Sequence, residues 1–171
     1  MISICCPTRG RPEFLEKFIK SIENTANNDV EILFRIDSDD IKSTNYLSNK
    51  KFKKIIGPRR RFLASNYNEL LQISSGSILM IASDDIEFLT PKWDTIVEEC
   101  YRRYKDEIIM CYGDDGSESS KFWGTHPFVS KKITEILGYL AFPIFNRHID
   151  SWINIITEKI KRKIFIPIKT I

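Results

Sequence analysis

The sequence predicts an α/β domain built around a mostly parallel β-sheet. Short apolar runs alternate along the chain with amphipathic segments of helical period, which is the pattern of successive βαβ units. Several of these runs are apolar throughout, as expected of strands that are covered on both faces. A sheet with right-handed crossovers and helices on both sides is therefore the expected architecture.

The first half of the chain contains four expected strands. The run "ISICC" (2–6) is stopped by Pro7, as is typical of a short buried strand. Residues 11–25 place apolar side chains at helical spacing, and Pro12 stands where the first turn of a helix tolerates proline. The remaining elements of this half are strands over 30–37, 52–57 and 77–83 and a helix over 59–76.

The second half is regular only at its beginning. An amphipathic helix is expected over 90–104 and a fifth strand over 107–113. A polar and aromatic loop follows Gly113, and a loop of that length in a compact domain is usually functional or mobile. Short helices are expected near 130–138 and from about 150 to 162. We expect one domain over the 171 residues.

Composition excludes several classes of protein. A net charge of +3, with basic and acidic residues interspersed, gives no reason to expect a nucleic-acid partner. The four cysteines form no CxxC pair, and Cys5 and Cys6 are adjacent inside an apolar run, so buried free thiols in a reducing compartment are expected. The amino terminus has neither a signal peptide nor a transmembrane segment, which favours a cytoplasmic protein.

Acidic residues follow the expected strands. Asp84 and Asp85 end the strand 77–83, and parallel strands end at one edge, outside which ligands bind. Gathered carboxylates repel one another unless a cation lies among them, and oxygen ligands favour Mg²⁺ or Mn²⁺. The alternative for any single acid is that it holds the next turn. The other residues expected at this edge are Thr8, Arg9, Asp37 to Asp40, Asp114 and Asp115.

No glycine-based phosphate cradle is present, because the sequence contains neither GxGxxG nor GxxxxGK[ST]. Phosphate would therefore be bound by a metal and by arginines. Arg61 is expected at the start of a helix, whose amino terminus also favours anions. For Arg59 and Arg60, solvated charge is the favoured interpretation. The candidate arginines are Arg9, Arg11, Arg59, Arg60 and Arg61.

Three segments together resemble the GT-A glycosyltransferases, in particular the family-two-like branch that uses nucleotide-diphospho-sugars. They are "CPTRGRPEFLEKFIKSI", "RIDSDD" and "RRRFLASNYNELLQISSGSILMIASDD", and they cover roughly residues 1–95 in good order and spacing. The resemblance implies a three-layer sandwich with a Rossmann-like GT-A sheet. It also implies that 1–95 is the nucleotide-binding half and 96–171 the acceptor-side half.

The same resemblance implies roles for individual residues. Asp37 would contact the base, usually uracil, and Asp85 would bind the Mn²⁺ or Mg²⁺ ion that bridges the diphosphate. Asp84 would face the sugar or ribose, although Ser83-Asp84-Asp85 stands where many relatives have Asp-x-Asp, which leaves the division between the two acids open. The residues implied to bind the nucleotide-diphospho-sugar are Pro7, Thr8, Arg9, Asp37, Arg61, Asn66 and Asp84.

The second half must supply the acceptor site. His148 and Asp150 precede the last expected helix at a spacing that suits a metal ligand and a proton acceptor. Relatives often place a catalytic acid just before a late helix, which implies Asp150 as the catalytic base; capping that helix is the alternative. His126 is expected to be structural. Trp123 and Phe128 would close the core or stack on a sugar.

The expected function is metal-dependent, inverting hexosyl transfer from a UDP-sugar to a hydroxyl of a glycan, lipid-linked or protein acceptor. One alternative is a degenerate GT-A domain that binds a nucleotide or a partner without turnover. A sugar-phosphate nucleotidyltransferase ranks lower, because that class needs a glycine-rich first loop and "CPTRGRP" has one glycine.

Overall fold

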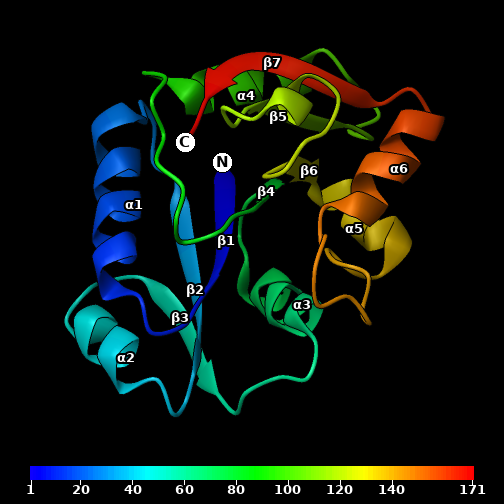
Figure 1. Ribbon diagram of the computed structural model, residues 1–171. Helices are drawn as coiled ribbons and strands as arrows, with labels where there is room; N and C mark the ends of the chain where they lie inside the picture. Colours follow the sequence, from blue (N-terminus) through cyan, green and yellow to red (C-terminus); the bar gives the residue numbers. More distant parts are fainter.

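The computed structural model describes residues 1–171 and contains one seven-stranded sheet, shown in Figure 1. Its order across the sheet is β3-β2-β1-β4-β6-β5-β7. The strands are β1 (Ile2–Thr8), β2 (Glu31–Asp37), β3 (Lys53–Gly57), β4 (Ile78–Ile81), β5 (Met110–Asp114), β6 (Phe128–Ser130) and β7 (Lys163–Lys169).

Helices cover both faces of this sheet, so the predicted α/β architecture is confirmed. In Figure 1, α1 and α2 lie on one side of the sheet, and α3, α5 and α6 on the other. The helices are α1 (Pro12–Thr25), α2 (Ile41–Ser48), α3 (Leu63–Ile73), α4 (Trp93–Arg102), α5 (Lys131–Leu137) and α6 (Ser151–Lys159), with a 3-10 turn at Glu118–Lys121.

Strand direction decides where the acidic residues gather. β1 pairs in parallel with β2 and β4, β2 with β3, and β5 with β7. Only β6 is reversed, since it is antiparallel to both β4 and β5. The carboxyl ends of β1, β2, β4 and β5 therefore share one edge, as the sequence predicted.

Two apolar layers hold the helices against the sheet. One cluster of 24 buried residues joins the sheet to α1, α2 and α4. Trp93, the largest fully buried side chain, belongs to it and is stacked on Phe88 with the ring centroids 4.2 Å apart. A second cluster of 15 residues joins the opposite face to α3, α5 and α6. Cys6 points into the first and Cys5 into the second, because neighbours along a strand face opposite ways. All four cysteines are free and buried, as expected.

The sequence did not predict α2, β6 or β7. α2 buries only Ser43 and Leu47, so it lacks a clear apolar stripe, and its start is fixed by the Asp40 side chain, which accepts the Ser43 N–H. β6 has three residues inside a polar segment. β7 is an edge strand in which Pro167 is exposed, and a proline argues against a strand unless it lies at an edge. No helix combines the length and hydropathy required to cross a membrane.

Candidate functional site

An open cleft of about 790 Å³ lies beyond the carboxyl ends of β1 and β2. It contains all but one of the residues that the sequence predicted to bind a nucleotide-diphospho-sugar; the exception, Asp84, is buried behind Thr8 and Arg11. The lining residues are Pro7, Thr8, Arg9, Arg11, Asp37, Arg59, Arg60, Arg61, Leu63, Asn66 and Asn146. Arg59 and Arg60 therefore face the cleft, although solvated charge was the favoured interpretation.

Arg9 closes one side of the cleft by joining the ends of β1 and β2. Its guanidinium lies 2.8 Å from Asp37 Oδ2 and donates two hydrogen bonds to Asp39, at 2.6 and 2.8 Å. The Arg9 guanidinium also lowers the pKa of the exposed Asp39 carboxyl to about 2. The ion pair between Arg9 and Asp37 holds Asp37 at the wall of the cleft and gives one oxygen of its carboxylate a hydrogen-bond partner.

Arg35 supports Asp37 from inside the protein. Its side chain is fully buried in β2 and points toward α3, where its Nε donates to Glu69 Oε2 at 2.5 Å. It also donates to the Pro58 carbonyl at 2.7 Å and lies 3.4 Å from Asp37 Oδ1. Arg35 therefore ties β2, the turn after β3 and α3 into one unit. An arginine inside an otherwise apolar strand was the signal for this role that the sequence analysis missed.

Arg11 neutralises the acidic pair after β4. Its guanidinium forms ion pairs with Asp84 and with Asp85, the latter at 3.1 Å. The second oxygen of Asp84 accepts a hydrogen bond from Thr8 at 2.5 Å, so this fully buried carboxylate is bound on both sides. The cation that these gathered carboxylates were expected to need is therefore present within the protein, as the Arg11 guanidinium.

The pKa values of the two adjacent acids are shifted in opposite directions. Burial raises the pKa of Asp84, and the Asp85 charge adds to this, against the opposing effects of Thr8 and Arg11. Burial acts on Asp85 as well, but the Ser83 hydroxyl and Arg11 outweigh it and lower the pKa of Asp85. Asp85, with 42% of its side chain exposed, is the carboxylate that is ionised and accessible at neutral pH.

The protein side chains at this edge could hold a metal ion only if a bound phosphate ligand supplied further oxygen atoms. No group of three His, Cys, Asp or Glu side chains in the chain is placed to hold an ion. Mg²⁺ and Mn²⁺ sites shared with phosphates, however, commonly use one or two carboxylates and complete the shell with phosphate oxygens and water. Asp85 has the chemistry and exposure for such a ligand. His148, the other predicted metal ligand, is exposed, with a left-handed backbone (φ 53°).

The amino terminus of α3 is not free to bind an anion, contrary to expectation. The helix begins at Leu63, two residues after Arg61, and its first N–H groups already have partners. Leu63 N donates to Asn146 Oδ1 at 2.9 Å, and Ala64 N to the Phe145 carbonyl at 3.0 Å. These hydrogen bonds attach the segment that contains Phe145 and Asn146, before α6, to the start of α3 beside the cleft.

Asn66 offers a polar atom that has no partner in the protein. Its Oδ1 is buried and forms no hydrogen bond, and the residue lines the cleft. Buried polar atoms in native proteins are nearly always paired, so an exception calls for an explanation. A ligand in the cleft is such an explanation, and it agrees with the predicted role of Asn66.

Three other acids at this edge hold turns, which was the alternative for each. Asp40 caps α2 and accepts the Gly10 N–H at 2.7 Å. Asp114 accepts the Gly116 N–H and the Ser120 hydroxyl, both at 2.8 Å. Asp115 accepts the Ser117 N–H at 2.9 Å and a hydrogen bond from Thr125. None of the three lines the cleft.

Asp150 immediately precedes α6, but its side chain does not cap the helix. The carboxylate instead accepts a hydrogen bond from Trp123 Nε1 at 2.5 Å. Burial raises the pKa of Asp150, and the Trp123 N–H, His126 and His148 oppose this rise only in part. Burial therefore has a larger effect on this carboxyl than its position before α6.

His126, which was expected to be structural, is electrostatically coupled to several carboxylates. Burial lowers its pKa, and the nearby carboxylates of Asp85, Asp115 and Asp150 counteract this only partly, so the imidazole is neutral at pH 7. His126 lines a small cavity together with Asp115 and Thr125. Phe128, by contrast, is 1% exposed in β6, which confirms its role in the core.

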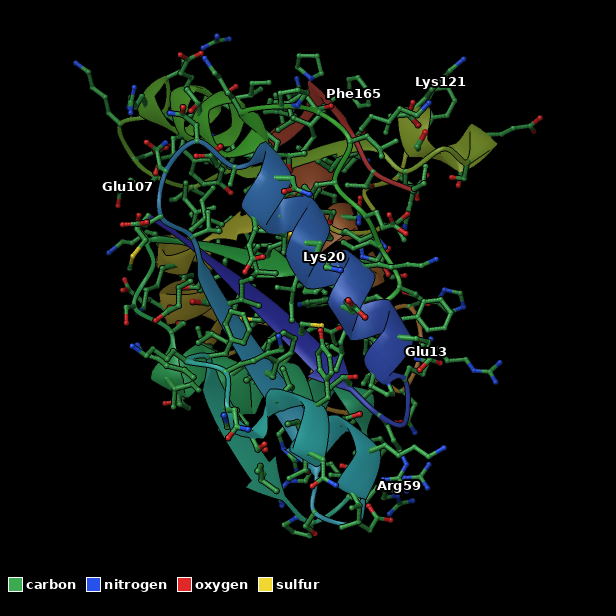
Figure 2. All side chains as sticks on the ribbon, turned by 90° about the vertical axis from the view of Figure 1, so that its left-hand side faces the viewer. Glu13, Lys20, Arg59, Glu107, Lys121 and Phe165 are labelled. Atoms are coloured by element: carbon green, nitrogen blue, oxygen red, sulfur yellow. The ribbon has the colours of Figure 1, made fainter.

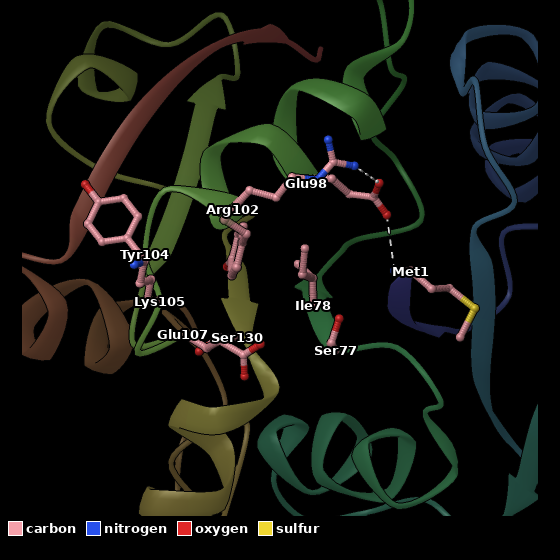
Figure 3. Close-up of a pocket in the computed structure, with 10 residues that line it drawn as sticks. Met1, Ser77, Ile78, Glu98, Arg102, Tyr104, Lys105, Glu107 and Ser130 are labelled. Atoms are coloured by element: carbon pink, nitrogen blue, oxygen red, sulfur yellow. Dashed lines mark ion pairs between the residues drawn. The ribbon is translucent and has the colours of Figure 1, made fainter.

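A second pocket, of about 430 Å³, lies at the opposite edge of the sheet (Figure 3). It is formed around Met1 and Ile78, at the amino ends of β1 and β4, and contains the ion pairs of Glu98 with the Met1 amino group and with Arg102. In Figure 2, Glu107 of this pocket and Arg59 of the cleft lie on opposite sides of the molecule. The second pocket contains none of the predicted site residues.

Comparison with known proteins gives consistent matches. The family described as Glycosyl transferase family 2 matches residues 3–165. Among curated proteins, the GalNAc(5)-diNAcBac-PP-undecaprenol beta-1,3-glucosyltransferase of Campylobacter jejuni is 31% identical over 137 residues, which are 72% of this chain and 42% of that protein.

Two solved structures share the fold. The mannosyltransferase PcManGT from Pyrobaculum calidifontis, in complex with GDP-Man and Mn²⁺, has a TM-score of 0.72 at 14% identity, over 98% of this chain and 56% of that one. A fragment of S. aureus TarS in complex with UDP has a TM-score of 0.69 at 9% identity, over 90% of this chain and 53% of that one. The chain thus spans about half the length of these proteins or less.

The buried position of Arg35 leads to a stability prediction. Replacing Arg35 with Met leaves Asp37 without its interior partner and removes the link to Glu69, and breaking a buried pair costs about 3–5 kcal/mol of unfolding free energy. Arg60→Met is the matched control, because Arg60 pairs with the same Glu69 from a position where 45% of its side chain is exposed. It should cost less than about 1 kcal/mol. Equal losses in urea unfolding would contradict the assigned role of Arg35.

Proposed function

Because the chain belongs to glycosyl transferase family 2, we propose that it transfers a hexosyl group from a UDP-sugar to an acceptor hydroxyl, with inversion at the sugar carbon. The observation that carries this proposal is the cleft at the carboxyl edge. Five of its lining residues are arginines, whereas Asp37 is the one acid among them. Such a surface suits a ligand with several negative charges and one hydrogen-bond donor for Asp37.

The arginines would hold the diphosphate in place of a glycine-rich cradle. Arg59 and Arg61 form no ion pair with the protein, so their guanidinium groups are available to phosphate oxygens. Asn66, with its unpartnered Oδ1, lies in the same cleft and would bond a hydroxyl of the donor. These groups bind the donor and would stabilise negative charge on the departing UDP.

Asp85 would hold a Mn²⁺ or Mg²⁺ ion, with Asp84 and His148 as the further protein groups proposed near it. When bound, the ion would supply charge stabilisation to the diphosphate. PcManGT, whose structure contains Mn²⁺, supports a divalent metal for this fold.

Asp150 would act as the general base. An acceptor hydroxyl bound beside it would lose its proton to the carboxylate as the sugar carbon passes through an oxocarbenium-like state. Its partly buried setting supports this role, because a carboxylate with a raised pKa is a stronger proton acceptor than an exposed one. The hydrogen bond from Trp123 would orient the carboxylate and leave its other oxygen for the acceptor.

The acceptor is proposed to be a lipid-linked glycan. The name of the Campylobacter relative describes glucosyl transfer to a glycan on PP-undecaprenol, which supports this acceptor class. The proposal extends to the organisation of the chain, with 1–95 as the nucleotide-binding half and 96–171 as the acceptor-side half of one domain. Asn146 is the residue that the second half contributes to the cleft.

A panel of nucleotide-diphospho-sugars tests the proposed function directly. Release of nucleoside diphosphate should be measured with and without Mn²⁺, in the presence of lipid-linked glycan acceptors. Release from a UDP-sugar, increased by the acceptor, is the expected result. UDP binding without any release would instead favour a binding module without turnover. This second candidate agrees with the lack of a preformed metal site of three protein ligands.

The base is tested by Asp150→Asn, which keeps the shape of the side chain. Loss of a general base lowers the rate by a factor on the order of a hundred to ten thousand, while UDP binding should be unchanged. In the parent protein, transfer should fall as pH decreases through the raised pKa of Asp150, because the protonated carboxyl cannot accept a proton.

Trp123→Phe provides the matched control for that pH profile. It removes the N–H that lowers the pKa of Asp150 but keeps an aromatic ring, so the acidic limb should move to higher pH. If Asp150→Asn transfers sugar at nearly the parent rate, the base lies elsewhere, and Asp115 is the next acid to test.

Asp37 is expected to select the base of the nucleotide. A carboxylate that accepts the imide N–H of uracil favours UDP over ADP, and a hydrogen bond to a charged group contributes roughly tenfold or more in affinity. Asp37→Ala should abolish this preference in calorimetric titrations. Asp39→Ala is the control, since it removes the other partner of Arg9 and should keep the preference for UDP. Equal affinity of the parent for UDP and ADP would contradict the assignment.

A further inference from the structure

Arg11 occupies a position between the acidic pair and the cleft. Its guanidinium bridges Asp84 and Asp85, and the residue also lines the cleft. Its backbone carbonyl accepts the N–H groups of Phe14 and Leu15, at 3.1 and 3.2 Å, so the start of α1 holds the main chain in place. The side chain remains 42% exposed. It can therefore turn from the acids toward the cleft without any change in the backbone.

A divalent cation would need the oxygens that Arg11 already uses. One oxygen of Asp84 accepts a hydrogen bond from the Thr8 hydroxyl and the other accepts one from Arg11. The two oxygens of Asp85 accept hydrogen bonds from Arg11 and from the Ser83 hydroxyl. No other acid at this edge is placed with these two to complete a metal site. Arg11 and a metal ion are thus alternative counter-charges for the same pair.

We propose that Arg11 is a resident counter-ion that a divalent metal must displace, and that bound nucleoside diphosphate favours the exchange by receiving the released guanidinium. This inference rests on the proposed function, from which it takes the metal and the diphosphate. In the free protein, the displaced Arg11 would meet a cleft whose single acid, Asp37, already pairs with Arg9. Diphosphate would supply the missing anion, so metal and nucleotide should each strengthen the binding of the other.

Metal affinity in the absence of nucleotide tests this exchange. Mn²⁺ binding should be measured by electron paramagnetic resonance, with and without UDP, for the parent and for Arg11→Gln. The parent should bind Mn²⁺ weakly alone and roughly fivefold or more tightly with UDP, within the usual range of coupling between two sites. Arg11→Gln should bind Mn²⁺ more tightly than the parent without UDP and should gain less from UDP.

Two further variants complete the design. Arg162→Gln removes the same charge from an exposed pair with Asp106, away from the cleft, and should bind Mn²⁺ like the parent. Arg11→Lys keeps the charge but lacks the forked guanidinium that spans two carboxylates, so its Mn²⁺ affinity should lie between those of the parent and Arg11→Gln. Arg11→Lys also carries the test if Arg11→Gln does not fold, as judged by circular dichroism.

The inference is overturned if removing the guanidinium leaves Mn²⁺ affinity unchanged or weakens it, or if no variant binds Mn²⁺ with or without UDP. The proposed function is judged separately, by sugar transfer from the donor panel. Sugar transfer together with unchanged Mn²⁺ affinity in Arg11→Gln would refute the counter-ion exchange and leave the glycosyltransferase activity standing. Tighter Mn²⁺ binding by Arg11→Gln in a protein that transfers no sugar would support the exchange and refute the activity.

Discussion

The pairing of arginines with carboxylates at one edge of the sheet is the constraint on which the site depends. Parallel strands deliver their carboxyl ends to the same place, so Asp37, Asp84 and Asp85 gather there whatever else the sequence does. Arg9 joins β1 to β2, Arg11 joins the start of α1 to the end of β4, and Arg35 joins β2 to α3. The same ion pairs that prevent repulsion therefore fix the loops that line the cleft.

This neutralisation also sets the character of the cleft. Once Arg9 and Arg11 have paired with the strand-end acids, the remaining open charge belongs to Arg59 and Arg61, which form no ion pair. The surface that faces solvent is then cationic, although the edge beneath it is rich in aspartate. An anionic ligand meets arginines first, and the buried carboxylates become relevant only where an arginine moves or a cation enters.

The first half of the fold was predictable because its strands and helices have regular apolar patterns. The remaining elements depend on contacts with residues far away in the sequence, which a local pattern does not reveal. The alternation of "ISICC" or "SILMIAS" with amphipathic segments predicts buried strands and the edge to which they lead, where Thr8, Arg9 and Asp37 stand. The resemblance to GT-A glycosyltransferases added Pro7, Arg61 and Asn66 as residues of the same cleft. β6 and β7 depend on neighbours far along the chain, so three or seven residues alone carry little signal. The role of Arg11 required knowing that residues 73 and 74 positions away lie beside it. No local pattern contains that information.

The burial of Asp84 has a consequence for the pH dependence of stability. Burial is the largest effect on this carboxyl and raises its pKa above the ordinary value, despite Thr8 and Arg11. For an acid whose pKa is higher in the folded state, the native protein is favoured at low pH, and this advantage disappears as pH rises through the folded pKa. Ionised Asp84 therefore costs stability at neutral pH, where a neutral residue of similar shape would carry no such penalty. A fully buried carboxylate that lies beside an ionised neighbour and is held by a half-exposed arginine is the arrangement from which the proposed exchange with a cation would start.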